Sequence, residues 1–267
     1  PRGRQRDADG APQRYHRSVG GRALRLGDHC HQGMDMAAAA EAARAMLAPD
    51  TTVLTIQNGL GSAAKVVAAL GAERVVLGVV GGFGASIVAP GKAHHNGMEL
   101  VRLGEMNRPV SERVESLADL WRGAGFTVKC FDDMDQLVWE KLICNCAFSA
   151  SSALTGWTVG EIIADSDAWS VASNCALEAY LVARASNIRL DIDDPISYVR
   201  DFGAKIPHAR PSMLLDHMAG RRSEIDAING AIPLAAARVG EKAPVNESVS
   251  ALVRAKENKF ISATGHE

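Results

Sequence analysis

The sequence has no apolar run that approaches the roughly 20 residues a helix needs to cross a bilayer. Its longest apolar runs, such as residues 75–80, have the length of a strand. It also lacks an excess of either charge, since the formal net charge is −2. Without a basic excess there is no global electrostatic argument for nucleic acid or for an anionic membrane surface. We therefore expect neither a membrane nor a nucleic acid as partner.

A Cys-x-x-Cys pair is also missing, although the chain contains 5 cysteines. Cys144 and Cys146 are two residues apart, so on a helix their side chains point to different faces. An odd number of scattered cysteines fits free thiols in a reducing compartment better than a disulfide framework. His29 and His31 look like metal ligands, but no second Cys/His pair lies at a zinc-site spacing. We expect a cytoplasmic protein without a metal.

Residues 1–33 differ from the rest of the chain: they are rich in arginine and glycine, contain no lysine, and show neither strand nor helix periodicity. Transit peptides are arginine-rich too, but Asp7, Asp9 and Asp28 argue against one. We interpret this segment as an atypical, disordered arm. A second hypothesis is a reading-frame error or a misassigned start, because a GC-rich gene read in the wrong frame yields arginine, glycine, proline and histidine.

Helical and strand-like segments alternate over residues 34–131. The composition predicts helices at 37–47, 63–70 and 111–123, with strands at 52–56, 74–80, 126–131 and within 92–105. The strands are apolar on both faces, which favours parallel pairing beneath helices on either side. The pattern predicts an α/β domain with a parallel sheet.

Residues 132–267 are predicted to be all-helical. Asp133 and Gln136 resemble a capping box that opens a helix through about residue 148. Further helices are predicted at 165–186, 223–239 and 246–259, with Asn246 as the N-cap of the last one. Pro233 falls inside the predicted helix 223–239, where it would clash with the carbonyl of Asn229 and cost about 3 kcal/mol unless a kink is present.

Three separated motifs carry the residues that could perform chemistry. Lys141 and Asn145 are four apart on one predicted helix, so they share a patch of its surface, and their apolar neighbours suggest a cleft. Asn58 follows a buried strand, at the end of which ligands bind in open parallel sheets. Ser212 and Glu224 form the third motif. Each residue alone also has an ordinary explanation as a surface lysine, a turn, a helix cap or a first-turn carboxylate.

Taken together, the segments Trp139-Glu-Lys-Leu-Ile-Cys-Asn-Cys, Gln57-Asn-Gly, Arg210-Pro-Ser and Glu224-Ile-Asp-x-Ile-Asn-Gly resemble the ketopantoate reductase (2-dehydropantoate 2-reductase) family. The resemblance runs from about residue 51 to residue 260. It implies an incomplete Rossmann-like domain at 34–131 and a helical substrate and dimerisation domain at 132–267. It also implies NADP-dependent reduction of 2-dehydropantoate, or a related 2-oxo acid, within pantothenate biosynthesis, and leaves a homodimer open.

The resemblance further assigns roles to individual residues. A hydride reduction leaves an alkoxide that must be protonated, and a lysine with a lowered pKa can supply that proton. The implied catalytic residues are Lys141 and Glu224, the implied substrate-binding residues are Asn145, Ser212 and Ser149, and the implied cofactor-binding residues are Asn58 and Glu224. Ser149 stands where the family commonly has an asparagine, and Val159 stands where some members have another, so the exact 2-oxo acid stays open.

The family's Gly-x-Gly-x-x-Gly turn, which holds the cofactor pyrophosphate at a helix N-terminus, has no counterpart in the sequence. Gly20-Gly21 follows no predicted strand, and Gly81-Gly-Phe-Gly comes too late in the fold. One alternative is therefore a truncated, catalytically inactive homologue that retains the helical domain. Another is a different β-hydroxyacid-type dehydrogenase, which the Glu224-Ile-Asp motif disfavours.

We predict that the chain binds NADPH more weakly than about 1 mM, or by less than about 4 kcal/mol, because no glycine-rich ring of amides receives the pyrophosphate. Titration calorimetry checks this. Adding a family-type strand, Gly-x-Gly-x-x-Gly turn and helix ahead of Met36 should restore binding, whereas micromolar affinity in the unmodified chain would contradict the prediction.

Overall fold

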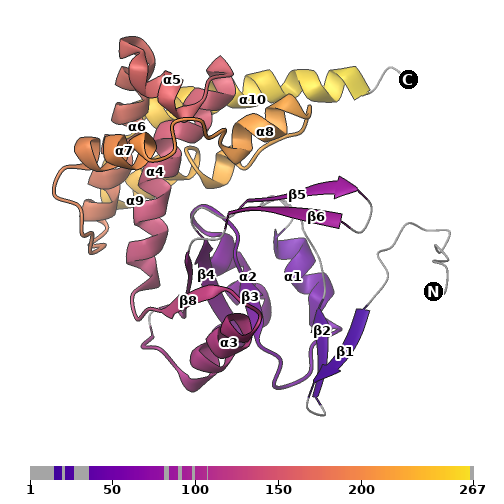
Figure 1. Cartoon of the computed structure of the whole chain (residues 1–267). Coiled ribbons are helices and arrows are strands. Elements are labelled where there is room, and N and C mark those ends of the chain that lie inside the picture. The colour runs from indigo at the N-terminus through magenta and orange to yellow at the C-terminus, as the bar shows by residue number, and fades with distance from the viewer. Residues whose placement is uncertain are drawn as a thin grey trace.

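The computed structural model describes residues 15–19, 22–26, 36–80, 84–89, 92–97, 100–106 and 108–264. An α/β half and a helical half stack on each other, and one long helix, α4, runs from the sheet into the helical half (Figure 1). The expected fold class, an α/β sheet domain followed by helices, is confirmed. The expected boundaries at residues 33 and 131 stay predictions.

The sheet of the α/β half has four strands in the order β3 (Val53–Thr55), β4 (Val75–Val80), β7 (Leu100–Gly104) and β8 (Thr127–Cys130). The pairs β3–β4 and β7–β8 are parallel, as expected, whereas β4 and β7 are antiparallel. Between these two strands the chain forms an antiparallel pair, β5 (Gly84–Ala89) and β6 (Lys92–Gly97). Because this pair leads the chain out and back without a crossover helix, β7 returns in the opposite direction.

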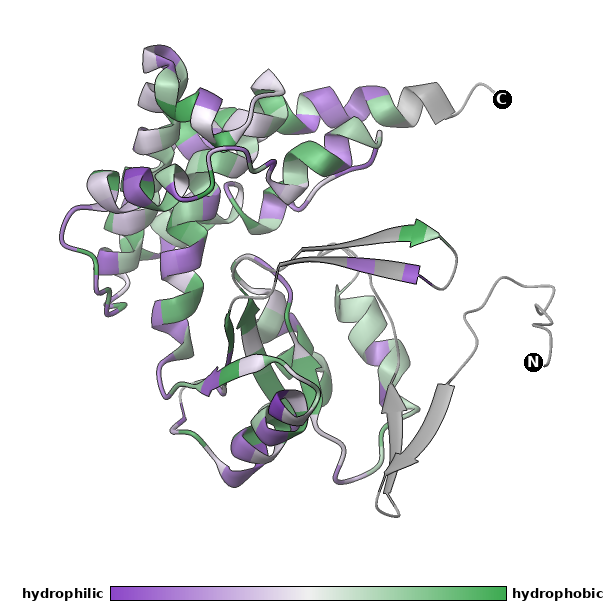
Figure 2. Ribbon diagram, in the orientation of Figure 1, coloured by the Kyte–Doolittle hydropathy of each residue, from purple (hydrophilic) through white to green (hydrophobic). Residues whose placement is uncertain are grey.

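Alternate residues of β4 build two separate layers of the core. Val75, Leu77 and Val79 pack beneath helices α1 (Met36–Arg44) and α2 (Ser62–Leu70). Val76 lies in the cluster on the other face, beneath α3 (Glu112–Gly123). A strand buried on both faces reads as a continuous apolar run, and Figure 2 shows the green central strands between the helices. A short 3₁₀ turn, η1 (Ala72–Arg74), links α2 to β4.

Two antiparallel strands, β1 (Tyr15–Val19) and β2 (Arg22–Leu26), occur where the sequence shows no strand period. The residues between them are Gly20 and Gly21, and a glycine pair is a composition that favours tight hairpins. The remainder of the predicted disordered arm, including the histidines at 29 and 31, lies outside the described residues.

The helical half is built around the long helix α4. Its fully buried alanines, including Ala147 and Ala150, pack among those of α6, which include Ala172, Ala176 and Ala179. As expected, Asp133 caps α4 by accepting from the Gln136 amide at 3.0 Å, but the Gln136 side chain bonds Glu140 instead of closing the capping box. The elements of this half are α4 (Met134–Thr155), α5 (Val159–Ala164), α6 (Ser166–Ala185), α7 (Pro195–Ala204), α8 (Ser212–Met218), η2 (Ile225–Ala227), α9 (Ala231–Val239) and α10 (Pro244–Thr264).

The single helix predicted over residues 223–239 is wrong. Ile228 has φ −104° and ψ −101°, which ends the short turn η2, and α9 begins only at Ala231. Pro233 therefore lies in the first turn of α9, where its missing amide hydrogen costs no helical hydrogen bond. Because the helix is interrupted at Ile228, no kink inside a helix is needed to accommodate Pro233.

Asn246 is also not an N-cap, because α10 begins at Pro244. Its buried side chain donates to the Cys175 carbonyl at 3.0 Å and to Glu178 at 2.8 Å, and accepts from Asn229 at 2.9 Å. Asn229 donates in addition to the Cys146 carbonyl of α4 at 2.8 Å. This buried network ties α4, α6 and α10 together, so the asparagine of the Glu-Ile-Asp-x-Ile-Asn-Gly motif is a core residue here.

The cysteines that the structure describes are all free thiols, and Cys144, Cys146 and Cys175 are buried. Burial raises the pKa of Cys144 and of Cys175 to about 12, while Cys130 on β8 is partly exposed. Within the described ranges, no helix is long and apolar enough to cross a membrane, and no three His, Cys, Asp or Glu side chains cluster as metal ligands would.

We predict that Gly104→Ala destabilises the fold by roughly 1–3 kcal/mol, as overpacking of a filled core does. A Cβ at Gly104 would lie 2.4 Å from the Phe131 carbonyl oxygen and 2.6 Å from Met134, where the sheet meets α4. Urea unfolding measures the change. Gly123→Ala is the matched control, because its Cβ would enter open space; an equal loss of stability in both variants would contradict the prediction.

Candidate active site

Lys141 reaches from α4 to the edge of the sheet where two parallel strands end. Its Nζ donates to the Oδ1 of Asn58 at 2.7 Å and to the backbone carbonyl of Val80 at 2.6 Å. Asn58 lies just beyond the carboxyl end of β3, and Val80 is the last residue of β4. This edge is where ligands bind in open α/β sheets, so the lysine stands at the expected position for a site.

The turn that carries Asn58 is held by the 3₁₀ segment η2 of the helical half. Gly59 has φ +85°, and a Cβ there would lie 2.3 Å from the carbonyl oxygen of Ala227. The same oxygen accepts from the Leu60 amide at 2.9 Å. Only glycine permits both the positive φ and this close approach, so the Asn-Gly pair fixes where the asparagine side chain points.

Glu224 immediately precedes η2 and approaches Asn58 from the other side. The Nδ2 of Asn58 lies 3.5 Å from the Oε2 of Glu224, at the long limit of a hydrogen bond. The asparagine amide therefore faces the lysine with its oxygen and the glutamate with its nitrogen. Three of the residues that the sequence singles out, Lys141, Asn58 and Glu224, form one polar chain across the two halves.

Burial is the main perturbation at Lys141. Loss of hydration lowers the pKa of its ammonium to about 8, the nearby charge of Glu224 opposes this shift, and Arg102 on β7 adds to it. A lysine with such a pKa is still mostly protonated at neutral pH but releases its proton more readily than a solvated lysine. The site therefore contains an ammonium group whose pKa lies close to physiological pH.

A small cavity of about 20 Å³, enough for about one water molecule, lies beside this lysine. Asn145 lines it one helical turn from Lys141, as the four-residue spacing predicts. The complete lining is Gln57, Asn58, Gly59, Gly78, Val79, Val138, Lys141, Leu142 and Asn145. A larger cavity of about 400 Å³ lies at the opposite end of β4, where Arg44 and Arg74 donate to backbone carbonyls. We place the chemistry at the smaller one, because it holds the perturbed lysine.

Ser149 and Ser212, the two serines predicted to bind substrate, lie in different surroundings. Ser149 is buried in α4, two turns beyond Lys141, and Ser212 is the first residue of α8 and is exposed. Neither lines the cavity beside Lys141. Their substrate-binding roles stay predictions, as do the roles of the residues that do converge.

Sequence reasoning missed three contributors to the site. Gly78 lets the strand pass close to its neighbour, since a Cβ would lie 2.7 Å from the side chain of Ile56. Arg102 acts on Lys141 through its charge and stands on a strand whose residues alternate between buried and partly exposed, a pattern that could have drawn attention to it. The Val80 carbonyl is backbone, which no sequence pattern marks.

Comparison with known proteins matches this chain to one family. The model of the ketopantoate reductase PanE/ApbA family matches residues 30–108, and the model of its C-terminal region matches residues 133–257. A 2-dehydropantoate 2-reductase of Caulobacter vibrioides is 33% identical over 211 residues, which are 79% of this chain and 70% of that protein. The chain belongs to the ketopantoate reductase family. Another 2-dehydropantoate 2-reductase, from Streptococcus pyogenes serotype M1, is 28% identical over 215 residues, 80% of this chain and 70% of that protein.

Solved structures of ketopantoate reductases have the same fold. The family member from Ralstonia eutropha JMP134 superposes with a TM-score of 0.78 at 30% identity, covering 86% of this chain and 74% of that one. The 2-dehydropantoate 2-reductase of Geobacter metallireducens GS-15 gives 0.77 at 30% identity, with 84% and 74% covered. A D-mandelate dehydrogenase in complex with NADH gives 0.78, but its 23% identity supports the fold alone. The resemblance expected from the sequence is confirmed.

We predict that the free energy of unfolding of the wild-type protein, minus that of Lys141→Met, rises by roughly 2–3 kcal/mol between pH 7 and pH 10. The folded-state pKa of about 8 lies below the ordinary 10.5, so below pH 8 folding bears the full penalty of burying a charged lysine. Above pH 8 the folded lysine loses its proton while the unfolded one keeps it, and the penalty fades. Urea unfolding at several pH values measures this. Lys65→Met, at an exposed lysine of α2, is the control; the same pH dependence there would contradict it.

Proposed function

We propose that this protein reduces 2-dehydropantoate, or a closely related 2-oxo acid, to the 2-hydroxy acid with NADPH. The observation that carries the proposal is the buried ammonium of Lys141, with a pKa lowered to about 8, held by Asn58 at the carboxyl ends of β3 and β4. Relatives about 30% identical that are named 2-dehydropantoate 2-reductase support the reaction class.

Lys141 supplies the proton in the proposed reaction. A reduced nicotinamide bound beside Asn58 and Glu224 would supply the hydride for the ketone carbon, and the carbonyl electron pair would move to oxygen. Lys141 donates its proton to that oxygen and becomes neutral, so a hydroxyl group forms without a free alkoxide. Asn58 holds the ammonium in place through its carbonyl oxygen, and Glu224 favours the charged form of the lysine before the reaction.

The side chains near Lys141 fit the reacting end of a dinucleotide. Asn58 and Glu224 offer an amide and a carboxylate, which can hydrogen-bond to hydroxyl and amide groups. The pyrophosphate end requires backbone amides at a glycine-rich helix N-terminus, and the sequence holds no Gly-x-Gly-x-x-Gly turn. NADP in preference to NAD, and a cytoplasmic setting, are parts of the proposal that rest on the family.

Substrate binding is proposed for Asn145, Ser149 and Ser212. The observation in favour of Asn145 is that it lines the cavity beside Lys141. Ser212 is the first residue of α8, and α8 packs on α4, the helix that carries Lys141 and Asn145. A homodimer is proposed because exposed leucines stand on the outer helices, Leu181 on α6 and Leu252 on α10, and a structural neighbour from Staphylococcus aureus is described as a dimeric ketopantoate reductase.

We predict that Lys141→Ala lowers kcat by about 10²–10⁴-fold, the usual contribution of a general acid, while the affinity for NADPH changes little. The assay follows consumption of NADPH with 2-dehydropantoate and related 2-oxo acids. It is run on the chain itself and on the version with a family-type glycine-rich unit added ahead of Met36. Lys65→Ala on exposed α2 is the matched control and should keep full activity.

The same assay separates the proposal from its rival, a homologue that keeps the helical domain but no reductase activity. If only the extended protein reduces a 2-oxo acid and the chain itself does not, the rival describes the chain correctly. If the extended protein binds NADPH and still reduces none of the 2-oxo acids, the proposed reaction is wrong. If the Lys141→Ala variant were as active as the wild-type protein, the proposed reaction would stand, but Lys141 would not be its proton donor.

A further inference from the structure

Glu224 is held in the site by its neighbours along the chain and not by a helix of its own. It stands between Ser223, which is buried, and the short turn η2, with φ −84° and ψ 31°. On the far side of η2, the Ala227 carbonyl is fixed by the Leu60 amide and by close contact with Gly59. What fixes the near side therefore helps to set the backbone position from which the Glu224 side chain extends.

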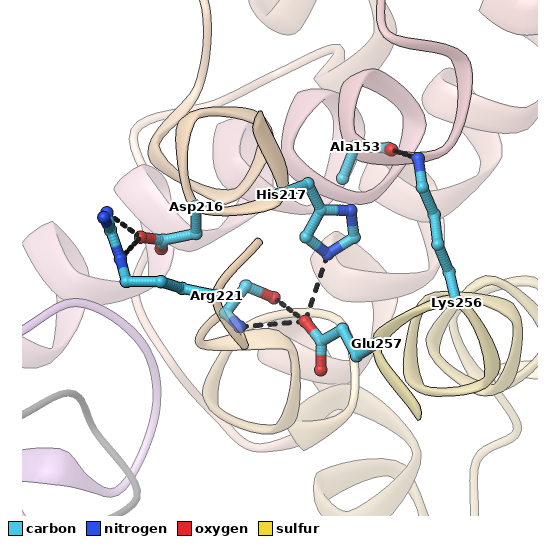
Figure 3. Close-up of polar contacts among 7 residues, drawn as sticks. Ala153, Asp216, His217, Arg221, Lys256 and Glu257 are labelled. Atoms are coloured by element: carbon cyan, nitrogen blue, oxygen red, sulfur yellow. Dashed lines mark hydrogen bonds and ion pairs between the residues drawn. The ribbon is translucent and has the colours of Figure 1, made fainter. Parts of the chain in front are cut away.

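The near side is fixed by Glu257, a buried carboxylate on α10. Its Oε1 accepts from the backbone amide of Ser223 at 2.8 Å and from the Ser223 hydroxyl at 2.6 Å. The same oxygen lies 3.1 Å from the Nε2 of His217 on α8. Figure 3 shows the Glu257 carboxylate at the centre of these contacts, between α8 and α10. The exposed fraction is 2% for Ser223 and 4% for Glu257, so water does not compete.

A buried carboxylate is costly unless its hydrogen bonds are made, and here two donors on one residue satisfy a single oxygen. Two bonds to Ser223, one from backbone and one from side chain, fix both the peptide plane and the hydroxyl rotamer immediately before Glu224. His217 in turn packs edge-on against Phe260 of α10, with ring centroids 5.2 Å apart. The arrangement is a rigid support that ends one residue from the site.

We propose that Glu257 is a positioning residue for the reductase site: by holding Ser223, it directs the Glu224 carboxylate toward Asn58 and Lys141. The role of Glu257 in the reaction rests on the proposed function, whereas its effect on the position of Glu224 rests on the contacts with Ser223. Glu257 itself stands outside the cavity and acts only through Ser223. Removing it should loosen Glu224 and leave Lys141 in place.

The test uses the chain as it is and requires no turnover. The Cε chemical shift of Lys141 is followed against pH in protein labelled with ¹³C-lysine, and the resonance is assigned by its loss in Lys141→Arg. Glu224 raises the pKa of Lys141, so Glu224→Gln should lower that pKa. Glu257→Ala should also lower the pKa of Lys141. Glu257→Gln, whose amide oxygen can still accept both bonds from Ser223, should lower it less.

Lys256→Ala is the matched control. Lys256 is the adjacent residue on α10 and donates to the Ala153 carbonyl near the end of α4, so its loss weakens the packing of α10 without touching Ser223 (Figure 3). It should leave the Lys141 titration unchanged. Ser223→Ala removes only the hydroxyl bond and provides a milder test where Glu257→Ala fails to fold; it should lower the pKa by a smaller amount.

The double variant Glu224→Gln/Glu257→Ala decides between positioning and general destabilisation. If Glu257 acts through Glu224, adding Glu257→Ala to Glu224→Gln should produce no further shift in the pKa of Lys141. A full additional shift, or an equal shift in Lys256→Ala, would overturn the inference. The proposed function fails separately, through absence of reduction in the extended protein, because the titration does not depend on catalysis.

Discussion

The site depends on one costly interaction, the burial of a lysine ammonium between the two halves of the molecule. A cation taken from water needs acceptors in place of its hydration. Lys141 finds them in an asparagine oxygen just beyond the end of β3 and in the last carbonyl of β4. Because β3 and β4 run parallel, their carboxyl ends lie at the same edge of the sheet. The direction of these two strands therefore brings both acceptors to the Lys141 ammonium.

The helical half supplies the rigidity that this interaction needs. The long helix α4 must hold Lys141 over the sheet edge, and the Asn229 amide anchors α4 by donating to the carbonyl of Cys146, which follows the lysine on the same helix. The same asparagine is bonded to Asn246, which reaches Glu178 on α6. The Glu-Ile-Asp-x-Ile-Asn-Gly motif thus serves two purposes, since its first residue faces the site and its asparagine orders the core behind it.

The parts of this structure that follow local rules could be predicted from the sequence. Continuous apolar runs indicated β3 and β4, the spacing of Lys141 and Asn145 placed both on one face of α4, and Asn58-Gly59 indicated a turn. The break at Ile228 could not be predicted, because the contact beside it is made with a distant part of the chain: the next residue, Asn229, donates to the Cys146 carbonyl. For the same reason Asn246 looked like a cap, whereas three distant partners hold it inside α10. The antiparallel return of β7 depends on the path taken by β5 and β6, which strand patterns do not encode.

The cysteines of the described part give the molecule an uneven chemical reactivity. The thiols of α4 and α6 are buried, and raised pKa values keep them in the poorly nucleophilic neutral form. Cys130, partly exposed at the end of β8 and only a few residues before α4 begins, is the most accessible of them to an alkylating label. A spectroscopic probe attached there would sit near the junction of the two halves, and its signal would report on the local environment of that junction.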